Sequence, residues 1–423
     1  MTEQRFTKQV GVTLITKVLG LCLSIVNAAI IARWLGPEGK GMLALALLVP
    51  GMLGLFLSGG IGVANVYFAG SRRLDVITLT ANSLGFAILA TILGFGIIIG
   101  LATGGWLEAI VPGVPIWILI IAILAFPTGL LKGFFSSILQ GLQRIFTLNL
   151  IDLSQGILTL SLTILFVIGL KLSLLGALVA PLASGFLSII VLGMLLRREG
   201  GLLTPRLKYS AIRTMLSFGL KGHIGNMLQF FNYRLDIFIL NGFLGPANVG
   251  IYTVSVRLAE LLWYLPDAVG FVIFPKAASS RPEDMNAFTP RVFHITLGLT
   301  ALGALGLALF GRPAINLVFS SVFIGAYVPM LVLLPGVVLL GGAKVLTNEI
   351  AGRGYPHYNS LNSGLALILT VILDLVLIPR YGLLGAALAS SIAYAAIFLT
   401  AIGFYLTVSR MAKEASSVQI PSL

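Results

Sequence analysis

Charged residues are scarce in this chain. Asp, Glu, Lys and Arg together make up 10% of its 423 residues, whereas 58% are hydrophobic, and an ordinary soluble domain is about 25% charged. The mean hydropathy is +1.04. No soluble core in a chain of this length could bury so much apolar surface, which excludes soluble enzymes and soluble binding domains. The solvent around most of the chain must therefore be lipid.

The side chains of common catalytic and metal sites are also few. The single cysteine, Cys22, lies inside an apolar run, which excludes a disulfide framework and a thiolate metal site. The three histidines form no H-E-x-x-H motif, and the sequence contains neither a G-x-S-x-G motif nor a G-x-x-x-x-G-K-[ST] phosphate loop. We therefore predict that the chain is not an enzyme, that it hydrolyses no ATP, and that it needs no cofactor except a coupling ion.

Acidic residues are outnumbered by basic ones, 14 to 27, which gives a formal net charge of +13. The basic residues lie in short loops between apolar runs and not in a patch with interleaved aromatics, so we predict no nucleic-acid partner. If the N-terminus is cytoplasmic, the inside segments hold 16 Lys and Arg and the outer loops hold 5. This positive-inside bias predicts that both termini are cytoplasmic.

Apolar runs with the length of a spanning helix, about 20 residues, recur through the sequence. The predicted spans are 9–32, 41–69, 77–104, 113–138, 147–170, 173–196, 215–243, 248–275, 290–310, 323–343, 358–379 and 382–409. The first run is too long for the core of a signal peptide, so it is expected to be an uncleaved helix. The predicted fold class is an all-α polytopic membrane protein with about 12 transmembrane helices in two six-helix lobes.

These spans also predict how the chain is divided. The lobes are expected at 1–196 and 215–409, joined by a basic linker at 197–214 and followed by a disordered cytoplasmic tail at 410–423. The linker contains Gly-Gly and Pro and reads as a hinge-like segment on the anionic cytoplasmic leaflet.

The two predicted lobes repeat each other at an offset of 209 residues. LGPEGKG begins at Leu35 and LGPANVG at Leu244, and the same offset aligns LLGAL from Leu174 with LLGAA from Leu383. Six helices separate the copies, so both have the same orientation in the membrane. Such parallel repeats are typical of transporters whose lobes rock about a midplane site. A duplicated scaffold without transport is the alternative.

Three predicted spans carry polar side chains along one helical face. The stripes consist of Thr13, Lys17, Ser24 and Asn27 in 9–32, of Asn226, Gln229, Tyr233 and Asp236 in 215–243, and of Arg257, Glu260, Tyr264 and Asp267 in 248–275. At the 209 offset, Lys17 coincides with Asn226 and Asn27 with Asp236. The first two stripes therefore occupy equivalent faces, as a central cleft between two lobes would require.

Ionisable residues inside a span are costly and indicate a functional site. Lys17, Arg234 and Arg257 would make a cationic cleft suited to a phosphate or pyrophosphate group. The cleft would also be lined by Asn27, Asn226, Gln229, Tyr233 and Glu260. Two alternatives stay open: Arg257 and Glu260 neutralise each other at i and i+3, or the uncharged side chains only bind neighbouring helices.

A second group of polar residues is predicted in the outer half of the second lobe. By helix rise, Asp236, Asp374, Thr370 and Ser390 lie at similar depths. Oxygen ligands that include two carboxylates suit a hard cation such as Na⁺, or a proton. The alternative is that Asp374 simply pairs with Arg380.

Four segments carry a resemblance to a known family. They are ARWLGPEGKGMLALALLVP after the basic N-terminus, QGLQR from Gln140, AGRGYPHYNSLN from Ala351, and RYGLLGAALAS. With these the chain resembles the polysaccharide-biosynthesis flippases of the multidrug/oligosaccharidyl-lipid/polysaccharide exporter superfamily, over essentially its whole length. It lacks the two extra C-terminal helices of the lipid II flippases.

The resemblance implies a carrier of the cell inner membrane with two lobes in a V around a central cleft. Its cargo would be a polyprenyl-pyrophosphate-linked oligosaccharide moved from the cytoplasmic to the outer leaflet, and a glycan polymerase or glycosyltransferases of the same pathway would be its partners. Asp236, Asp374 and Ser390 look like counterparts of a sodium site in related flippases.

The sequence thus predicts a lipid-linked oligosaccharide flippase that works by alternating access. The first alternative is a cation-coupled multidrug exporter on the same fold, which should have a more apolar, acidic cleft and should tolerate Lys17→Ala. The second is a non-transporting scaffold of a glycan-assembly complex, which would tolerate loss of the whole stripe.

Overall fold

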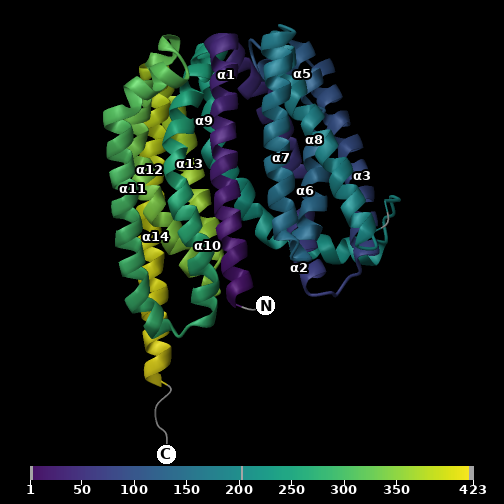
Figure 1. Cartoon of the computed structure of the whole chain (residues 1–423). Helices are drawn as coiled ribbons and strands as arrows, with labels where there is room; N and C mark the ends of the chain where they lie inside the picture. Colours follow the sequence, from purple (N-terminus) through teal and green to yellow (C-terminus); the bar gives the residue numbers. More distant parts are fainter. Residues whose placement is uncertain (1–2, 202, 419–423) are drawn as a thin grey trace, which may run out of the picture. The chain divides into compact units, whose positions relative to one another are not determined.

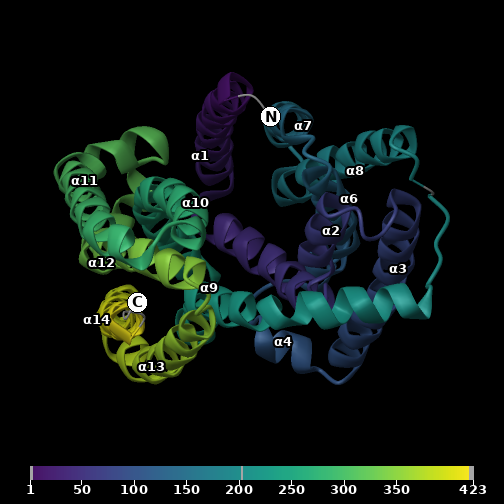
Figure 2. The same cartoon turned by 90° about the horizontal axis from the view of Figure 1, so that it is seen from below.

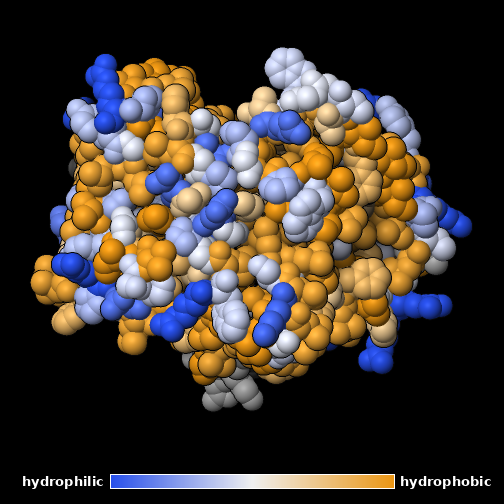
Figure 3. Space-filling view, turned by 90° about the horizontal axis from the view of Figure 1, so that it is seen from above, coloured by the Kyte–Doolittle hydropathy of each residue, from blue (hydrophilic) through white to orange (hydrophobic). Residues whose placement is uncertain are grey.

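The computed structural model describes residues 3–201 and 203–418, with side chains in these ranges except at 3–14, 221–222, 282 and 412–418. All regular structure in this part of the chain is helical, which confirms the all-α prediction. Ten of its helices are long and apolar enough to cross a membrane. Figure 3 shows hydrophobic residues over much of the visible surface, as expected where helices face lipid. The chain is a multi-pass membrane protein.

The chain divides into two compact units, Met1–Ile224 (unit 1) and Gly225–Leu423 (unit 2). The helices of unit 1 are α1 (Glu3–Leu57), α2 (Ile61–Gly70), α3 (Val76–Thr103), α4 (Trp106–Ile110), α5 (Ile116–Ala122), α6 (Ala125–Gly141), α7 (Ile145–Thr163) with the π-helical turn η1 (Ile164–Gly169), and α8 (Ser173–Arg198). Helix α9 (Tyr209–Glu260) begins in unit 1 and continues into unit 2.

In unit 1, α6 packs against α2, α3 and α8, and α7 packs against α1 and α8 (Figure 1). Phe126, Phe134 and Ile138 of α6 lie in the apolar core of this unit. Between helices in lipid, this packing stabilises mainly through van der Waals contact and a few hydrogen bonds. The buried Asn65 amide donates such bonds to the hydroxyls of Ser83 (3.0 Å) and Ser137 (3.2 Å).

Unit 2 is a second bundle. Beyond α9 it contains the short turn η2 (Leu261–Trp263), α10 (Tyr264–Ser279), α11 (Pro282–Val318), the turn η3 (Ser321–Ala326), α12 (Tyr327–Gly352), α13 (His357–Tyr381) and α14 (Leu383–Val418). Helix α12 is central, because it packs against α10, α11 and α14, and α13 packs against α14 (Figure 2).

The two LGP turns have nearly the same backbone conformation. Gly36 interrupts α1 with φ 68° and ψ −176°, and Gly245 interrupts α9 with φ 75° and ψ 176°. Positive φ at these positions suits glycine, which has no Cβ to clash. Ten candidate spans are found in place of twelve because α1 and α9 each run through one of these turns. The number twelve stays a prediction.

A second pair of repeat positions also corresponds. Ser173 (φ 49°), the first residue of α8, and Gly382 (φ 59°), the residue just before α14, both have positive φ. Three residues later, a Cβ on Gly176 would lie 2.9 Å from the carbonyl carbon of Phe166, and a Cβ on Gly385 would lie 2.1 Å from the carbonyl oxygen of Leu377. In each unit the last long helix therefore crosses the preceding one through a glycine.

The predicted linker is held to α3 of unit 1 by hydrogen bonds. The Lys208 N–H donates to Oδ1 of the buried Asn82 (2.7 Å), and the Arg206 N–H donates to the Ala81 carbonyl oxygen (3.1 Å). This extended segment therefore runs along α3, and α9 begins directly after it. The basic side chains of Arg206 and Lys208 are exposed, so contact with an anionic leaflet stays a prediction.

Two boundaries differ from the predicted ones. The span predicted at 41–69 is interrupted between α1 and α2, where Gly59 and Gly60 have φ of 56° and 71°. Helix α14 continues to Val418, so residues 410–418 are helical and not part of a disordered tail. Residues 419–423 of the predicted tail lie outside the described residues.

Candidate functional site

The predicted cation residue Asp236 lies buried in unit 2, on α9 before the Gly245 turn. Its Oδ2 accepts a hydrogen bond from the Tyr252 hydroxyl at 2.7 Å and a long one from Ser390 Oγ at 3.4 Å. Tyr252 follows the turn on the same helix, so the reversal at Gly245 brings the two residues together. Ser390 comes from α14. The structure thus brings Ser390 next to Asp236, and their role in binding a cation stays a prediction.

Arg234 and Glu260, two of the predicted substrate residues, form a two-point ion pair. Arg234 Nη1 donates to Glu260 Oε1 at 2.8 Å and Nη2 donates to Oε2 at 3.3 Å. The Glu260 side chain is 12% exposed and that of Arg234 is 31% exposed. Glu260 therefore has Arg234 as a partner, and the predicted alternative, in which Glu260 neutralises Arg257, stays open.

Aromatic side chains surround this ion pair. The ring centroid of Trp263 lies 4.9 Å from that of Tyr233 and 5.9 Å from that of Tyr394. Gln229 Nε2 donates to the Tyr233 hydroxyl at 3.1 Å. The rings come from α9, η2 and α14, and two of them, Trp263 and Tyr394, line a small pocket of unit 2.

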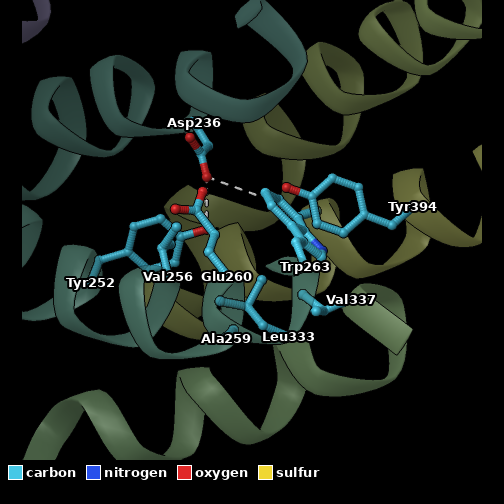
Figure 4. A pocket seen from close by; sticks show the side chains of 10 residues that line it. Asp236, Tyr252, Val256, Ala259, Glu260, Trp263, Leu333, Val337 and Tyr394 are labelled. Carbon is cyan, nitrogen blue, oxygen red and sulfur yellow. Dashed lines mark hydrogen bonds between the residues drawn. The ribbon is translucent and has the colours of Figure 1, made fainter. Parts of the chain in front are cut away.

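Figure 4 shows this pocket, with Tyr252 on one side of Glu260 and Trp263 and Tyr394 on the other. The pocket is lined by Asp236, Tyr252, Val256, Ala259, Glu260, Trp263, Leu333, Val337, Ser390 and Tyr394. Its polar side-chain groups are two carboxylates, three hydroxyls and the indole N–H of Trp263. The carboxylate and hydroxyl oxygens are ligands of the kind that hard cations prefer.

Asp374 is the second predicted cation residue. It is fully buried in α13, and within the described part of the chain neither of its carboxylate oxygens has a hydrogen-bond partner. Pairing with Arg380 is therefore absent there, and Arg380 is exposed in the last turn of α13. Asp374, like Asp236, is a buried residue of unit 2. Thr370, one turn earlier, donates to Asn232 Oδ1 at 2.8 Å.

The buried carboxylates of Asp236 and Asp374, the latter without a hydrogen-bond partner among the described residues, are expensive in an apolar medium unless a cation or a proton neutralises them. The donor set fits a hard monovalent cation, because carboxylate and hydroxyl oxygens are its preferred ligands. Among the described residues no group of three or more His, Cys, Asp or Glu side chains is found.

The remaining predicted substrate residues do not line this pocket. Lys17 is exposed on α1 in unit 1, and Asn27 is half-buried there with no hydrogen bond to its Oδ1 from the described residues. Asn226 is exposed on α9. Arg257 is half-buried on α9, three residues before Glu260. These four residues stay predictions.

Several residues of interest escaped sequence reasoning. Tyr252, Trp263 and Tyr394 are ordinary aromatic residues of apolar runs, and only the fold places them around Asp236. Lys132 forms an ion pair with Asp152 in unit 1 (2.8 Å). In unit 2, Lys344 pairs with Asp267 (2.7 Å) and lies over the Trp263 ring at 4.5 Å. The only sequence signal for these two ion pairs was the presence of single charged residues within long apolar runs.

Comparison with known proteins places this geometry in context. The sequence matches the family model described as a polysaccharide biosynthesis protein over residues 30–327. The chain is 31% identical over 189 residues to AglR of Haloferax volcanii, named as a probable flippase, with 43% of this chain and 39% of that protein covered. The chain thus spans about two fifths of the length of that archaeal relative.

A more complete match is to a Shigella flexneri protein named as an O-antigen transporter, which is 22% identical over 88% of this chain and 90% of that protein. Among solved structures, the lipid II flippase MurJ in its inward closed conformation superposes with a TM-score of 0.78 at 16% identity, covering 97% of this chain and 93% of MurJ. At that identity the likeness shows a shared fold.

Proposed function

Because the chain belongs to the polysaccharide biosynthesis protein family, we propose that it is a flippase that moves a polyprenyl-pyrophosphate-linked oligosaccharide across the membrane by alternating access. The family match over residues 30–327 carries the proposal. The names of the relatives, a flippase and an O-antigen transporter, support a glycan cargo for surface polysaccharide over a drug. A multidrug exporter on the same fold is the outcome that the experiment below would detect.

The anionic pyrophosphate needs cationic contacts, for which we propose Lys17, Arg234 and Arg257. Lys17 is exposed and available for such a contact. Arg234 is bound by Glu260, but a guanidinium has five N–H donors. An anion can therefore share Arg234 with Glu260 without breaking the pair. The neutral polar contacts proposed are Asn27, Asn226, Gln229 and Tyr233.

A coupling ion, Na⁺ or a proton, is proposed to bind Asp236 and Asp374, with the hydroxyls of Ser390 and Thr370 nearby. The ion would supply the positive charge that two buried carboxylates lack. Tyr252 donates to Asp236 Oδ2 and fixes the orientation of that carboxylate. The unpartnered oxygens of Asp374 are the observation that supports an ion there.

The proposed setting is the cell inner membrane, with both termini cytoplasmic. It is supported by the bias of Lys and Arg toward one set of loops. The lipid bilayer is the immediate partner, and a glycan polymerase or glycosyltransferases of the same pathway are proposed as protein partners.

The test is translocation of a fluorescent polyprenyl-pyrophosphate oligosaccharide in liposomes that contain the full-length protein. Protein-free liposomes give the background, and a chemical quencher in the outer solution reports the leaflet. We expect faster translocation with the wild type than without protein, and a loss of about tenfold or more for Lys17→Ala/Arg257→Ala, because each change removes a charged contact.

The other outcomes separate the alternatives. Translocation that the double variant leaves unchanged keeps the flippase and removes these two residues from the proposed site. Absence of translocation together with efflux of a lipophilic cation moves the assignment to the multidrug exporter. Absence of both, in protein that is folded by size-exclusion chromatography, supports a non-transporting scaffold.

A further inference from the structure

Unit 1 contains an ion pair inside its membrane spans that the proposed function does not yet use. Lys132 lies on α6 and Asp152 on α7, and Lys132 Nζ is 2.8 Å from Asp152 Oδ1. Lys132 is nine residues before Gly141, the last residue of α6, and Asp152 is seven after Ile145, the first of α7. At about 1.5 Å per residue, both lie roughly 10 Å or more from these helix ends.

The exposure of this pair is unusual for charges at that depth. The Asp152 side chain is 63% exposed and that of Lys132 is 29% exposed. A carboxylate exposed to hydrocarbon would be costly, so this face of unit 1 must border water or a polar ligand. On α6, Gly129 and Gly133 are also exposed, and a Cβ on either would meet no atom of the described residues within 4 Å. The helix surface beside Lys132 is open.

A related pair occurs in unit 2. Lys344 lies on α12, eight residues before Gly352, the last residue of that helix, and pairs with Asp267 of α10 at 2.7 Å. At the 209 offset, Lys132 corresponds to position 341, so Lys344 lies one turn further along the same face. Both units thus place a lysine at similar depth and pair it with a largely exposed aspartate.

Exposure distinguishes this pair from the pairs Arg234–Glu260 and Lys344–Asp267 by how readily each can open. Glu260 is 12% exposed, so releasing Arg234 would strand a buried charge. Asp267 is 61% exposed, but Lys344 is only 13% exposed and lies against Trp263. In the pair of unit 1, the carboxylate is exposed enough to stay hydrated when released. The side chain of Lys132 is also more exposed than that of Lys344.

We propose that Lys132 binds a phosphate oxygen of the lipid-linked pyrophosphate, and that Asp152 is its counter-ion when no substrate is bound. The proposal rests on the proposed function and adds a contact to it. The lysine ammonium has three donors, of which Asp152 takes one at 2.8 Å. An arriving phosphate can use the other donors and then displace the hydrated Asp152 carboxylate. On release of the substrate, Asp152 returns and keeps Lys132 from holding the anion.

The test is whether substitutions of Lys132 and Asp152 change the Kd for a pyrophosphate lipid in opposite directions. Full-length protein in detergent is titrated with farnesyl pyrophosphate, with farnesol and inorganic pyrophosphate as separate probes. We expect Lys132→Gln to raise the Kd for farnesyl pyrophosphate about tenfold, as loss of one charge-assisted contact implies. Asp152→Asn should lower it by roughly threefold or more, because a competing anion is removed. Lys132→Arg should bind within about threefold of the wild type, since the cation is retained.

The control is Lys171→Gln, which removes an exposed lysine outside the predicted spans and should leave the Kd unchanged. Farnesol should bind with no difference between variants. If inorganic pyrophosphate alone shows the full Lys132 effect and farnesyl pyrophosphate shows none, the contact is to free phosphate and the proposal is wrong. The same holds if Lys132→Gln and Asp152→Asn weaken binding equally, because that is the behaviour of a structural ion pair.

Failure of this inference can be told from failure of the proposed function. A wild type that translocates the lipid-linked oligosaccharide in liposomes, while Lys132→Gln binds farnesyl pyrophosphate normally, overturns the inference alone. A wild type that neither binds farnesyl pyrophosphate nor translocates the oligosaccharide overturns both.

Discussion

Arg234 and Glu260 are joined by two nearly parallel hydrogen bonds, 2.8 and 3.3 Å long, between residues 26 positions apart on α9. The chain reverses at Gly245 between them, so the pair ties the two arms of this helix together. Glu260 is almost buried. An ion pair in such a place is costly to break, because removing one partner leaves an uncompensated charge.

The first prediction concerns this ion pair. Glu260→Gln should lower the free energy of unfolding by about 3 kcal/mol, as breakage of a buried pair does. Arg234→Met/Glu260→Leu should recover much of that stability, because no charge is left unpaired, while translocation stays impaired for lack of Arg234. Thermal unfolding in detergent and the liposome assay measure the two effects.

Asp284→Asn is the matched control for this prediction. Asp284 pairs with Arg281 at 3.2 Å, with side chains 59% and 82% exposed, and such a surface pair contributes about 0–1 kcal/mol. A double variant as unstable as Glu260→Gln would contradict our account of the pair. Normal translocation by a stable double variant would remove Arg234 from the proposed substrate contacts.

The second prediction concerns the coupling ion. If Na⁺ binds at Asp236 and Asp374, the Tm should be higher in sodium chloride than in choline chloride at equal ionic strength. The reason is that a ligand at 100 times its Kd stabilises the folded protein by about 2.7 kcal/mol. Asp374→Asn should abolish this rise. It should also stabilise the ion-free protein, since it replaces a carboxylate without hydrogen-bond partners among the described residues.

The variant Asp284→Asn should keep the full sodium-dependent rise in Tm, because its carboxylate is on the surface. A wild type whose Tm depends on pH but not on sodium would favour a proton as the coupling ion. An equal sodium effect in the wild type and in Asp374→Asn would place the ion elsewhere.

Local features were predictable from the sequence. The LGP turns at Gly36 and Gly245 were recognised because glycine followed by proline stops a helix and because the motif recurs at a fixed offset. Long apolar runs predicted the membrane helices for the same reason that lipid requires them. Asp236 and Ser390 were placed together by estimating depth from helix rise, and the structure joins them.

Partner choice was not predictable, because it depends on how helices pack. Arg257 is the arginine one turn from Glu260 in sequence, and no local pattern predicts that Glu260 pairs with Arg234, which the Gly245 reversal brings alongside. The linker bond from Lys208 to Asn82 spans 126 residues, and no local pattern encodes it. Lys132 and Asp152 were missed because each is a lone charge in an apolar run, and only contact between α6 and α7 makes them a pair.

The last prediction concerns the crossing of α13 and α14. A Cβ on Gly385 would lie 2.1 Å from the Leu377 carbonyl oxygen, and this atom belongs to the backbone and cannot rotate away. Gly385→Ala must therefore push the helices apart, at a cost of about 1–3 kcal/mol or more. Gly176→Ala, at the equivalent position of unit 1, should also destabilise, since its Cβ would lie 2.9 Å from backbone of Phe166.

Gly403→Ala is the matched control, because Gly403 is on α14 as well and a Cβ there would meet no atom within 4 Å. Alanine should be neutral at this position or stabilise by up to about 1 kcal/mol, since it restricts the unfolded chain and favours a helix. Thermal unfolding of the three variants in the same detergent checks the ranking. Equal Tm values for Gly385→Ala and Gly403→Ala would mean that α13 and α14 do not meet closely at Gly385.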